Sequence, residues 1–447
     1  MSTSPSIAWL RDDLRLADNP ALTAAAKRGE PVAVLYLLDE ESSGIRPLGA
    51  ASKWWLEQSL AALDKDLGGA LILRRGTAAT EVPKLVAELG AGAVFWNRRY
   101  GGPQREVDAA LKSGLREQGL EVQSFQANLM HEPWTVTTGS GTPFKVFTPF
   151  WRACLEQGEP RHPLPAAKFE TVTAPSVDLE LGQFWADGFG EGWVPGEHGA
   201  RERLDDFIAD GLEDYEKGRD EPAKAATSRL SPHLRFGEIS PFQVWERVSR
   251  DDLSPAARRN AAKFLREVGW REFNWNILFH APTLPTENFR PEFDEFPWST
   301  PSEMTLKAWQ TGRTGIPLVD AGMRELWKTG YMHNRVRMVV ASLLIKNLLV
   351  DWRLGEAWFW DTLVDADEAN NPANWQWVAG SGADAAPYFR VFNPVLQADK
   401  FDAKREYQLR WVPELDSPDY PEPIVDLRQS RAEALEAFDH LKRSAAS

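Results

Sequence analysis

The segment from Trp358 to Pro394 combines residue types that an ordinary hydrophobic core seldom needs together. It reads WFWDTLVDADEANNPANWQWVAGSGADAAPYFRVFNP and holds two close acids, paired asparagines and two tryptophans two positions apart. Because a buried polar group is costly without a partner, this mixture indicates a ligand with both flat rings and hydrogen-bonding edges. A flavin is such a ligand. A polar loop between two helices is the alternative, since asparagine, glycine and proline also favour turns.

Three further stretches carry side chains that could bind a nucleotide. TSRLS at 227–231 is rich in hydroxyls at a predicted helix start, where free N–H groups could hold a diphosphate with Arg229 as counter-charge. A simple helix cap is the alternative, and the stretch alone favours it. KFLREVGWREF and YMHNRVRM supply a carboxylate, amides, guanidinium groups and an indole, which suit a cavity that stacks bases and binds their edges. Their polar and aromatic members are Glu267, Trp270, Arg271, His333, Asn334, Arg335 and Arg337.

The sequence gives little support to several other chemistries. GSGADA at 380–385 formally resembles a dinucleotide loop, but no strand–helix–strand unit surrounds it. No Ser–His–Asp arrangement is recognisable, and no two of the seven histidines have metal-ligand spacing, so we expect neither classical hydrolysis nor a metal site. A single cysteine, Cys154, excludes intrachain disulfides and a cysteine-ligated cluster.

Length and composition predict a globular protein of two domains. The 447 residues, 43% of them hydrophobic, exceed what one core usually supports. We find no secretory leader and no apolar run long enough to span a bilayer, and therefore expect a soluble, cytoplasmic protein without a membrane partner. The formal net charge of −14 argues against a general nucleic-acid coat but permits a local basic rim.

Residues 1–128 predict a doubly wound parallel sheet of five strands. Short apolar runs alternate with amphipathic segments at 19–28, 50–67, 79–89 and 104–118; the runs are SIAWL, PVAVLYLLD, ALILRRG, AGAVFWNRR and EVQSFQ. Ligands of such sheets lie beyond the carboxyl ends of the strands. After the first run the chain has RDDLRLADNPAL in place of a glycine-rich loop, and Asp18 or Asn19 can cap a helix begun by Pro20.

Residues 129–196 predict an interdomain linker draped over both domains, because sequence rich in Pro, Gly and Thr replaces the periodicity. An aromatic island in it, KVFTPFWRA, should dock as a short helix. Helical spacing prevails at 197–447, so the second domain should be all-α. There the apolar run MVVASLLIKNLLV contains Lys346 and Asn347, which favours burial in the domain over a membrane span.

Phrases in one order along nearly the whole chain resemble the signature blocks of the photolyase/cryptochrome family. They are RDDLRLADNPAL, TSRLSPHLRFGEISP, WREF, AWQTGRTGIPLVDAGMRELW, MHNRVRM, DWRLGE and WQWVAGSGADAAPYFRVFNP. The chain most resembles bacterial class III cyclobutane pyrimidine dimer photolyases, which share WNRRY and NWQWVAGSGADA. The resemblance implies light-driven DNA repair, in which photoexcited reduced FAD donates an electron to a dimer flipped out of the duplex and receives it back after the ring splits. Blue-light signalling through a partner is the alternative; Asn371 and the short C-terminus favour repair.

The resemblance implies a U-shaped FAD in the helical domain. Asn371 would face the flavin's reactive ring nitrogen, where an amide neither repels the flavin anion nor gives it a proton. Trp375, Trp352 and Trp309 would pass electrons inward, although each alone would more often be a core aromatic. The complete cofactor set would be Tyr215, Thr227, Ser228, Arg229, Leu230, Ser231, Arg271, Asn334, Arg337, Asp365, Asp367 and Asn371.

The resemblance also implies ultraviolet-damaged DNA as the partner of a monomer. Trp270 and Trp377 would stack on the two pyrimidines, and Glu267 would hydrogen-bond the dimer. Asn334 and Met338 would line the cavity floor; Asn334 stands where enzymes for the (6-4) photoproduct carry a second histidine, which favours the dimer. Phosphate or rim contacts would come from Arg219, Arg335, Arg390, Gln397 and Lys400.

An antenna chromophore is a further implication of the resemblance. Pro103 and Gln104 stand where first-class enzymes carry an Asn-Glu pair that helps bind folate. Methenyltetrahydrofolate is nevertheless favoured over 8-hydroxydeazaflavin or FMN. Between Leu415 and Tyr420 the chain should lack a segment of roughly fifteen to twenty residues that its relatives carry.

Overall fold

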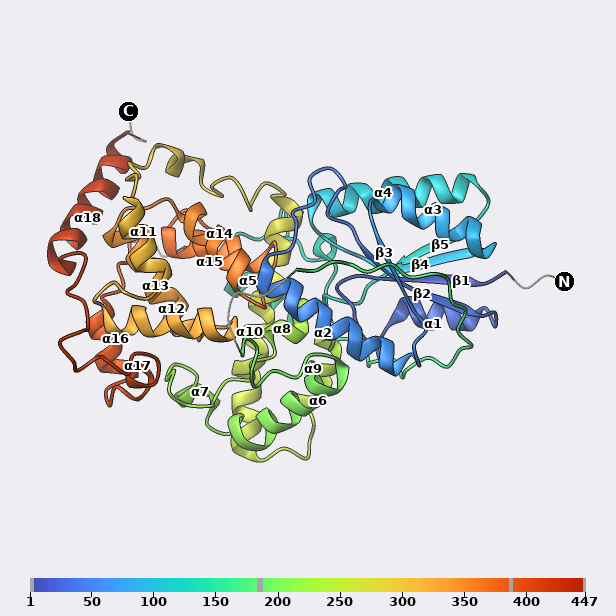
Figure 1. Cartoon of the computed structure of the whole chain (residues 1–447), viewed down its shortest axis with the longest axis horizontal. Coiled ribbons are helices and arrows are strands. Elements are labelled where there is room, and N and C mark those ends of the chain that lie inside the picture. The colour runs from blue at the N-terminus through green and yellow to red at the C-terminus, as the bar shows by residue number, and fades with distance from the viewer. Residues whose placement is uncertain (1–3, 183–187, 386–388, 445–447) are drawn as a thin grey trace.

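The computed structural model describes residues 4–182, 188–385 and 389–444. An α/β domain and a larger helical domain lie side by side, and the linker joins them (Figure 1). Residues 386–388, which belong to the segment that opened the sequence analysis, lie outside the described residues.

The α/β domain is built on a parallel five-stranded sheet of order β3-β2-β1-β4-β5. Its strands are β1 (Ser6–Leu10), β2 (Val32–Leu38), β3 (Leu71–Arg75), β4 (Ala93–Asn97) and β5 (Glu121–Phe125). All residues of β1, β2 and β4 are buried, as expected for a parallel sheet that is covered on both faces. The predicted doubly wound sheet is confirmed.

Two pairs of helices cover the sheet. Helices α1 (Pro20–Lys27) and α2 (Ala50–Asp66) lie on one face, and α3 (Ala78–Leu89) and α4 (Gly102–Glu117) lie on the other (Figure 1). Of the two candidate caps of α1, Asn19 is used, because its side chain accepts the N–H of Leu22 at 3.2 Å. Asp18 has a φ of 49° and instead accepts the N–H of Leu164 in the linker at 2.9 Å.

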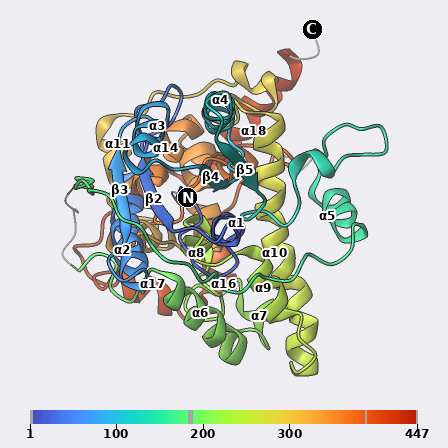
Figure 2. The same ribbon diagram turned by 90° about the vertical axis from the view of Figure 1, so that its right-hand side faces the viewer.

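The linker contains η1 (Pro133–Thr135) and α5 (Phe147–Glu156), so the aromatic island does form a helix, as predicted. Phe147, Phe150 and Trp151 are buried in one cluster with residues of α10, and Figure 2 shows α5 to one side of that long helix. The chain then passes along the edge strand β3, where the N–H of Val177 donates to Leu73 at 3.0 Å. The boundaries at 128 and 196 stay predictions.

The second domain is helical throughout its described part. Its core includes most of the apolar run MVVASLLIKNLLV. Lys346 within that run is wholly buried, as predicted. No helix among the described residues is long and apolar enough to cross a bilayer. The elements are α6 (Glu197–Asp206), η2 (Phe207–Gly211), α7 (Tyr215–Gly218), α8 (Ser231–Arg235), α9 (Pro241–Val248), α10 (Pro255–His280), η3 (Pro291–Glu295), α11 (Glu303–Gln310), α12 (Pro317–Thr329), α13 (Asn334–Ser342), η4 (Leu343–Asn347), α14 (Trp352–Thr362), α15 (Asn370–Ala379), α16 (Pro394–Phe401), α17 (Glu406–Trp411) and α18 (Leu427–Ser444).

Candidate functional site

A buried ion pair lies where the resemblance places the flavin. Both oxygens of Asp365 accept from the guanidinium of Arg337, at 3.0 and 2.8 Å, and the hydroxyl of Ser231 donates to Asp365 at 2.6 Å. Burial alone would lower the pKa of Arg337, but Asp365 beside it raises that pKa above its usual value. The predicted pairing of these two residues is therefore present, and it joins α8, α13 and the loop before α15.

The TSRLS stretch does not act as a helix cap. Leu230 occupies the N-cap position of the short helix α8 and makes no side-chain capping bond. Arg229 has a φ of 52°, and its guanidinium lies 4.2 Å from the ring centroid of Trp193 and 4.8 Å from that of Tyr331. Its buried Nε has no acceptor among the described residues, which fits an anionic ligand such as the FAD diphosphate.

The remaining residues of the predicted cofactor set lie on several elements. Tyr215 is buried, with its ring centroid 5.5 Å from that of Phe264, and Thr227 and Ser228 are half-buried. Asp367 accepts the N–H of Ala369 at 2.8 Å and so caps the start of α15. Arg271 donates to the carbonyl of Asn128 at 2.7 Å. Asp367 and Arg271 also line a cavity between the domains.

The side-chain amide of Asn371 is held by α14. Its Nδ2 donates to the backbone carbonyl of Glu356 at 3.0 Å and to the carboxylate Oε1 of Glu356 at 2.8 Å. Glu356 in turn forms an ion pair with Arg46 of the α/β domain, with N–O distances of 2.8 and 3.0 Å. The sequence analysis missed both of these supporting residues.

Tryptophan side chains gather behind Asn371. The ring of Trp375 meets those of Phe359 and Trp309 edge-on, at centroid distances of 4.9 and 6.3 Å. Trp352, the first residue of α14, donates its indole N–H to Asn288 at 2.9 Å. Trp309 and Trp352 are both fully buried, so neither forms the solvent-facing end of an electron path.

Trp298, which the sequence analysis did not single out, is half-buried. The N–H of the next residue, Ser299, donates to Leu349 at 2.7 Å, which places Trp298 close to the start of α14. Trp298 packs against the core cluster that contains Trp352. Its only sequence signal was an aromatic residue in the phrase FPWST.

Gly355 gives the indole of Trp375 the space it needs. A Cβ at position 355 would lie 2.2 Å from Cη2 and 2.4 Å from Cζ3 of Trp375. We therefore expect Gly355→Ala to displace Trp375 and to destabilise the fold by about 1–3 kcal/mol, despite the better helix propensity of alanine. Light-driven reduction of bound FAD should slow in the same variant. Thermal unfolding and flavin absorbance under illumination measure both effects; an unchanged reduction rate would contradict the packing argument.

The two lesion-stacking candidates lie on different helices. Trp270 of α10 stacks on Phe147 of α5 at a centroid distance of 3.9 Å, so one of its faces is covered. Trp377 of α15 donates its indole N–H to the carbonyl of Asp384 at 3.1 Å. The backbone N–H of Asp384 donates to Lys145, two residues before Phe147, at 3.1 Å. The hydrogen bond between Asp384 and Lys145 thus links the turn that holds Trp377 to the segment that packs on Trp270.

Charged residues surround this region in pairs. Arg219 and Glu267 form an ion pair, and Arg335 pairs with Asp220 at 2.8 Å. Asn334 is exposed at the start of α13, and Met338 lies half-buried one turn later. Burial lowers the pKa of the neighbouring His333 to about 4, so this histidine is neutral at pH 7 and its ring accepts the N–H of Arg335.

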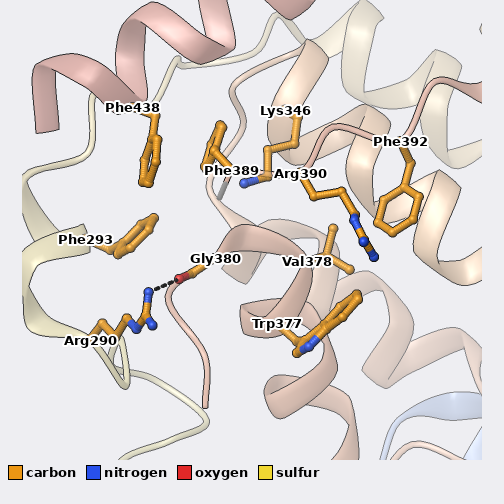
Figure 3. A pocket seen from close by; sticks show the side chains of 10 residues that line it. All are labelled: Arg290, Phe293, Lys346, Trp377, Val378, Gly380, Phe389, Arg390, Phe392 and Phe438. Carbon is orange, nitrogen blue, oxygen red and sulfur yellow. Dashed lines mark hydrogen bonds between the residues drawn. The ribbon is translucent and has the colours of Figure 1, made fainter. Parts of the chain in front are cut away.

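A small cavity lies beside Trp377 (Figure 3). Arg390, which is exposed, and Phe392 lie on the Trp377 side, while the ammonium of Lys346 lies next to the ring of Phe389. Lys346 donates to the carbonyl of Ala379 at 2.6 Å, and burial lowers its pKa well below the usual value. The remaining rim candidates lie on α16, where Lys400 is exposed and Gln397 has a buried Oε1 without a partner among the described residues.

A third and wider cavity, called the interdomain cavity below, also lies between the two domains. Tyr36, Trp275 and Trp360 give it flat apolar walls, and charged residues of both signs complete its lining. Gln104 of α4 donates to Glu368 across it; burial raises the pKa of Glu368, and this hydrogen bond opposes the rise. The indole N–H of Trp275 is buried without an acceptor among the described residues. Such a cavity suits a planar ligand with polar edges.

Two family models match the chain. The first, described as DNA photolyase, matches residues 6–168, and the second, described as the FAD binding domain of DNA photolyase, matches residues 264–419. The second range includes the ion pair of Arg337 and Asp365, the amide of Asn371 and the tryptophans of the proposed path.

Close relatives extend over the whole chain. It is 48% identical to a deoxyribodipyrimidine photo-lyase of Agrobacterium fabrum, covering 99% of both chains. That alignment has 483 positions, more than the 447 residues here, so the relative carries segments that this chain lacks. Cryptochrome-1 of Arabidopsis thaliana is 37% identical over 98% of this chain and 70% of its own length. Among solved structures, a bacterial class III photolyase from Agrobacterium tumefaciens matches with a TM-score of 0.93 and 47% identity, covering 99% of this chain and 98% of that one.

Proposed function

The chain belongs to the photolyase/cryptochrome family, and we propose that it repairs ultraviolet-damaged DNA by splitting cyclobutane pyrimidine dimers with light. One observation carries the proposal: within two turns, α15 presents an amide at Asn371, a buried indole at Trp375 and a half-buried indole at Trp377. Flavin contact, electron supply and lesion contact thus share one rigid element.

FAD, when bound and reduced, supplies the photoexcited electron for the cleavage. The chain's residues bind and orient the reactants. Arg229 faces the diphosphate, and the pair of Asp365 and Arg337 fixes the wall of the flavin site. Asn371 presents a neutral amide to the flavin ring. Because the reaction returns the electron, it needs no strong acid or base.

Electrons for reducing the flavin come through the tryptophans. Trp375 is the inner member, with Trp309 and Trp352 next to it in the core. We add Trp298 as the outer member, because it is half-buried and lies near the start of α14. Each of these indoles is held by packing or by a hydrogen bond, so the path keeps a fixed geometry.

The lesion is held by indoles and a carboxylate. Trp377 and the free face of Trp270 stack on the two pyrimidines, and Glu267, now paired with Arg219, hydrogen-bonds the dimer. Asn334 and Met338 form the floor. The DNA around the lesion is contacted by Arg335, Arg390, Gln397 and Lys400. The basic residues among them form a local positive patch on an acidic protein.

Trp377→Ala should weaken binding of dimer-containing DNA without loss of FAD. Stacking of one base on an aromatic side chain contributes about 1–3 kcal/mol, so we expect roughly a 5- to 150-fold weaker affinity. Fluorescence anisotropy with a labelled damaged oligonucleotide measures it. Trp134→Ala is the matched control, because Trp134 is a half-exposed indole on the linker. Loss of FAD from the Trp377 variant would contradict its assignment to the lesion.

We further propose that the interdomain cavity binds the antenna chromophore, with methenyltetrahydrofolate favoured over 8-hydroxydeazaflavin or FMN. The aromatic walls at Tyr36, Trp275 and Trp360 and the unpaired N–H of Trp275 support a planar, polar-edged ligand. Reconstitution with each chromophore, followed by the excitation spectrum of repair, identifies the one that transfers energy. The protein would act as a cytoplasmic monomer at the nucleoid.

Signalling without repair is the second candidate, because cryptochrome-1 of Arabidopsis thaliana matches 98% of this chain at 37% identity. The amide at position 371 favours repair. The deciding experiment illuminates the reduced protein with a thymine-dimer oligonucleotide and assays restored monomers against a dark control. Restoration only in the light supports repair; no restoration with FAD bound and reduced would reject it.

A further inference from the structure

We propose that Arg46 of the α/β domain is a positioning residue that determines which end of the Asn371 amide faces the flavin. The inference rests on the proposed function for the place of the flavin beside Asn371. Arg46 lies 325 positions before Asn371 in the chain (371 − 46), and it reaches the amide through Glu356 of α14.

The hydrogen bonds of Asn371 permit only one orientation of its side-chain amide. The two N–H groups of its Nδ2 have two acceptors on the same side, the carbonyl and the carboxylate Oε1 of Glu356, at 3.0 and 2.8 Å. Turning the amide over would set Oδ1 against two oxygens, which repel it. Oδ1 therefore points away from Glu356, and no described residue donates to it. It is the group that Asn371 offers to the flavin.

This orientation depends on Glu356 being an acceptor only. A carboxylate has no proton to donate, whereas a protonated carboxyl could donate to Oδ1 and let the amide turn over. The side chain of Glu356 is 4% exposed, and a buried charge is costly unless it is paired and hydrogen-bonded. Arg46 compensates it with two parallel bonds of 2.8 and 3.0 Å.

The guanidinium of Arg46 is itself fixed. It lies 4.1 Å from the ring centroid of Trp360, whose indole N–H donates to the carbonyl of Pro47 at 2.9 Å. A Cβ at Gly49 would lie 2.0 Å from the carbonyl oxygen of Trp360, so only glycine permits this close contact. The N–H of Ala50 donates to Asp361 at 2.9 Å. The chain before α2 is thus locked onto α14, where Figure 1 shows the start of α2 next to the helical domain.

Arg46 also lines the interdomain cavity. A ligand in that cavity contacts the same guanidinium that orients Asn371 through Glu356. Three side chains, Arg46, Glu356 and Asn371, therefore connect the interdomain cavity to the proposed flavin site.

The test replaces Arg46 by methionine, which keeps the apolar contact with Trp360 and removes the charge. We expect the midpoint potential of bound FAD, titrated in the dark, to become more negative, because a turned-over amide donates to the oxidised ring and stabilises it. A tenfold change in the reduction equilibrium corresponds to about 30 mV for a two-electron couple. Arg46→Lys should restore part of the shift. Arg75→Met, at a half-exposed arginine on the edge strand, should leave the potential unchanged.

A second variant guards against loss of folding. The double variant Arg46→Met with Glu356→Gln leaves no lone buried charge, and it should show the same negative shift. A wild-type potential in both variants would overturn the role of Arg46. Repair by the pre-reduced wild-type protein is measured in parallel: a shift without repair would contradict the proposed function alone, and repair without a shift would contradict this inference alone.

Discussion

Replacing Trp375 by phenylalanine should abolish light-driven reduction of oxidised FAD, while the protein reduced chemically beforehand still repairs dimers. A benzene ring is far harder to oxidise than an indole, and Trp375 is 3% exposed, so no solvent donor can replace it. The smaller ring should destabilise the core by about 1–2 kcal/mol, which leaves the fold intact.

The measurement compares flavin absorbance during blue illumination in the presence of a thiol donor. Trp55→Phe serves as control, since Trp55 is equally buried but lies in the α/β domain, where its N–H donates to Glu238 at 2.9 Å. If the Trp375 variant were reduced at the wild-type rate, the electron path would have to enter from another side of the flavin.

Asp365→Asn should release FAD from the purified protein. The substitution leaves the half-buried guanidinium of Arg337 without its counter-charge and weakens the bond from Ser231. Removing one partner of a buried ion pair costs about 3–5 kcal/mol, and we expect the low end because the side chain of Arg337 keeps 23% exposure.

The ratio of flavin to protein absorbance after gel filtration measures this loss, and thermal unfolding of the apo-protein measures the cost to the fold. Asp439→Asn is the control, because Asp439 is an exposed carboxylate on α18, away from the ion pair. Full retention of FAD in the Asp365 variant would remove the pair from the flavin site.

Local patterns predicted the elements better than they predicted their partners. Strands β1, β2 and β4 were recognisable because each is a short apolar run that is buried from both sides. The choice between Asn19 and Asp18 as cap was open, and a positive φ at Asp18 decided it. Ser231 looked like a cap, but a distant carboxylate at Asp365 takes its hydroxyl. Spacing in sequence contains no information on that contact.

The electron path shows the same limit. Trp309 was named from phrase similarity alone, and the structure places it fully buried against Trp375, while Trp298, which we propose as the outer member, is half-buried. Arg46 could not have been found from sequence, because its partner Glu356 lies 310 positions away. Exposure and long-range pairing are properties of the packed chain.

The central claim is that the electron returns after each cleavage, and counting repaired dimers per flavin tests it most directly. Protein reduced in the dark is illuminated without oxygen and without any external electron donor, in excess dimer-containing oligonucleotide. We predict many dimers split per FAD, with the flavin spectrum still that of the reduced form at the end. At most one dimer per flavin, accompanied by oxidised flavin, would contradict the account.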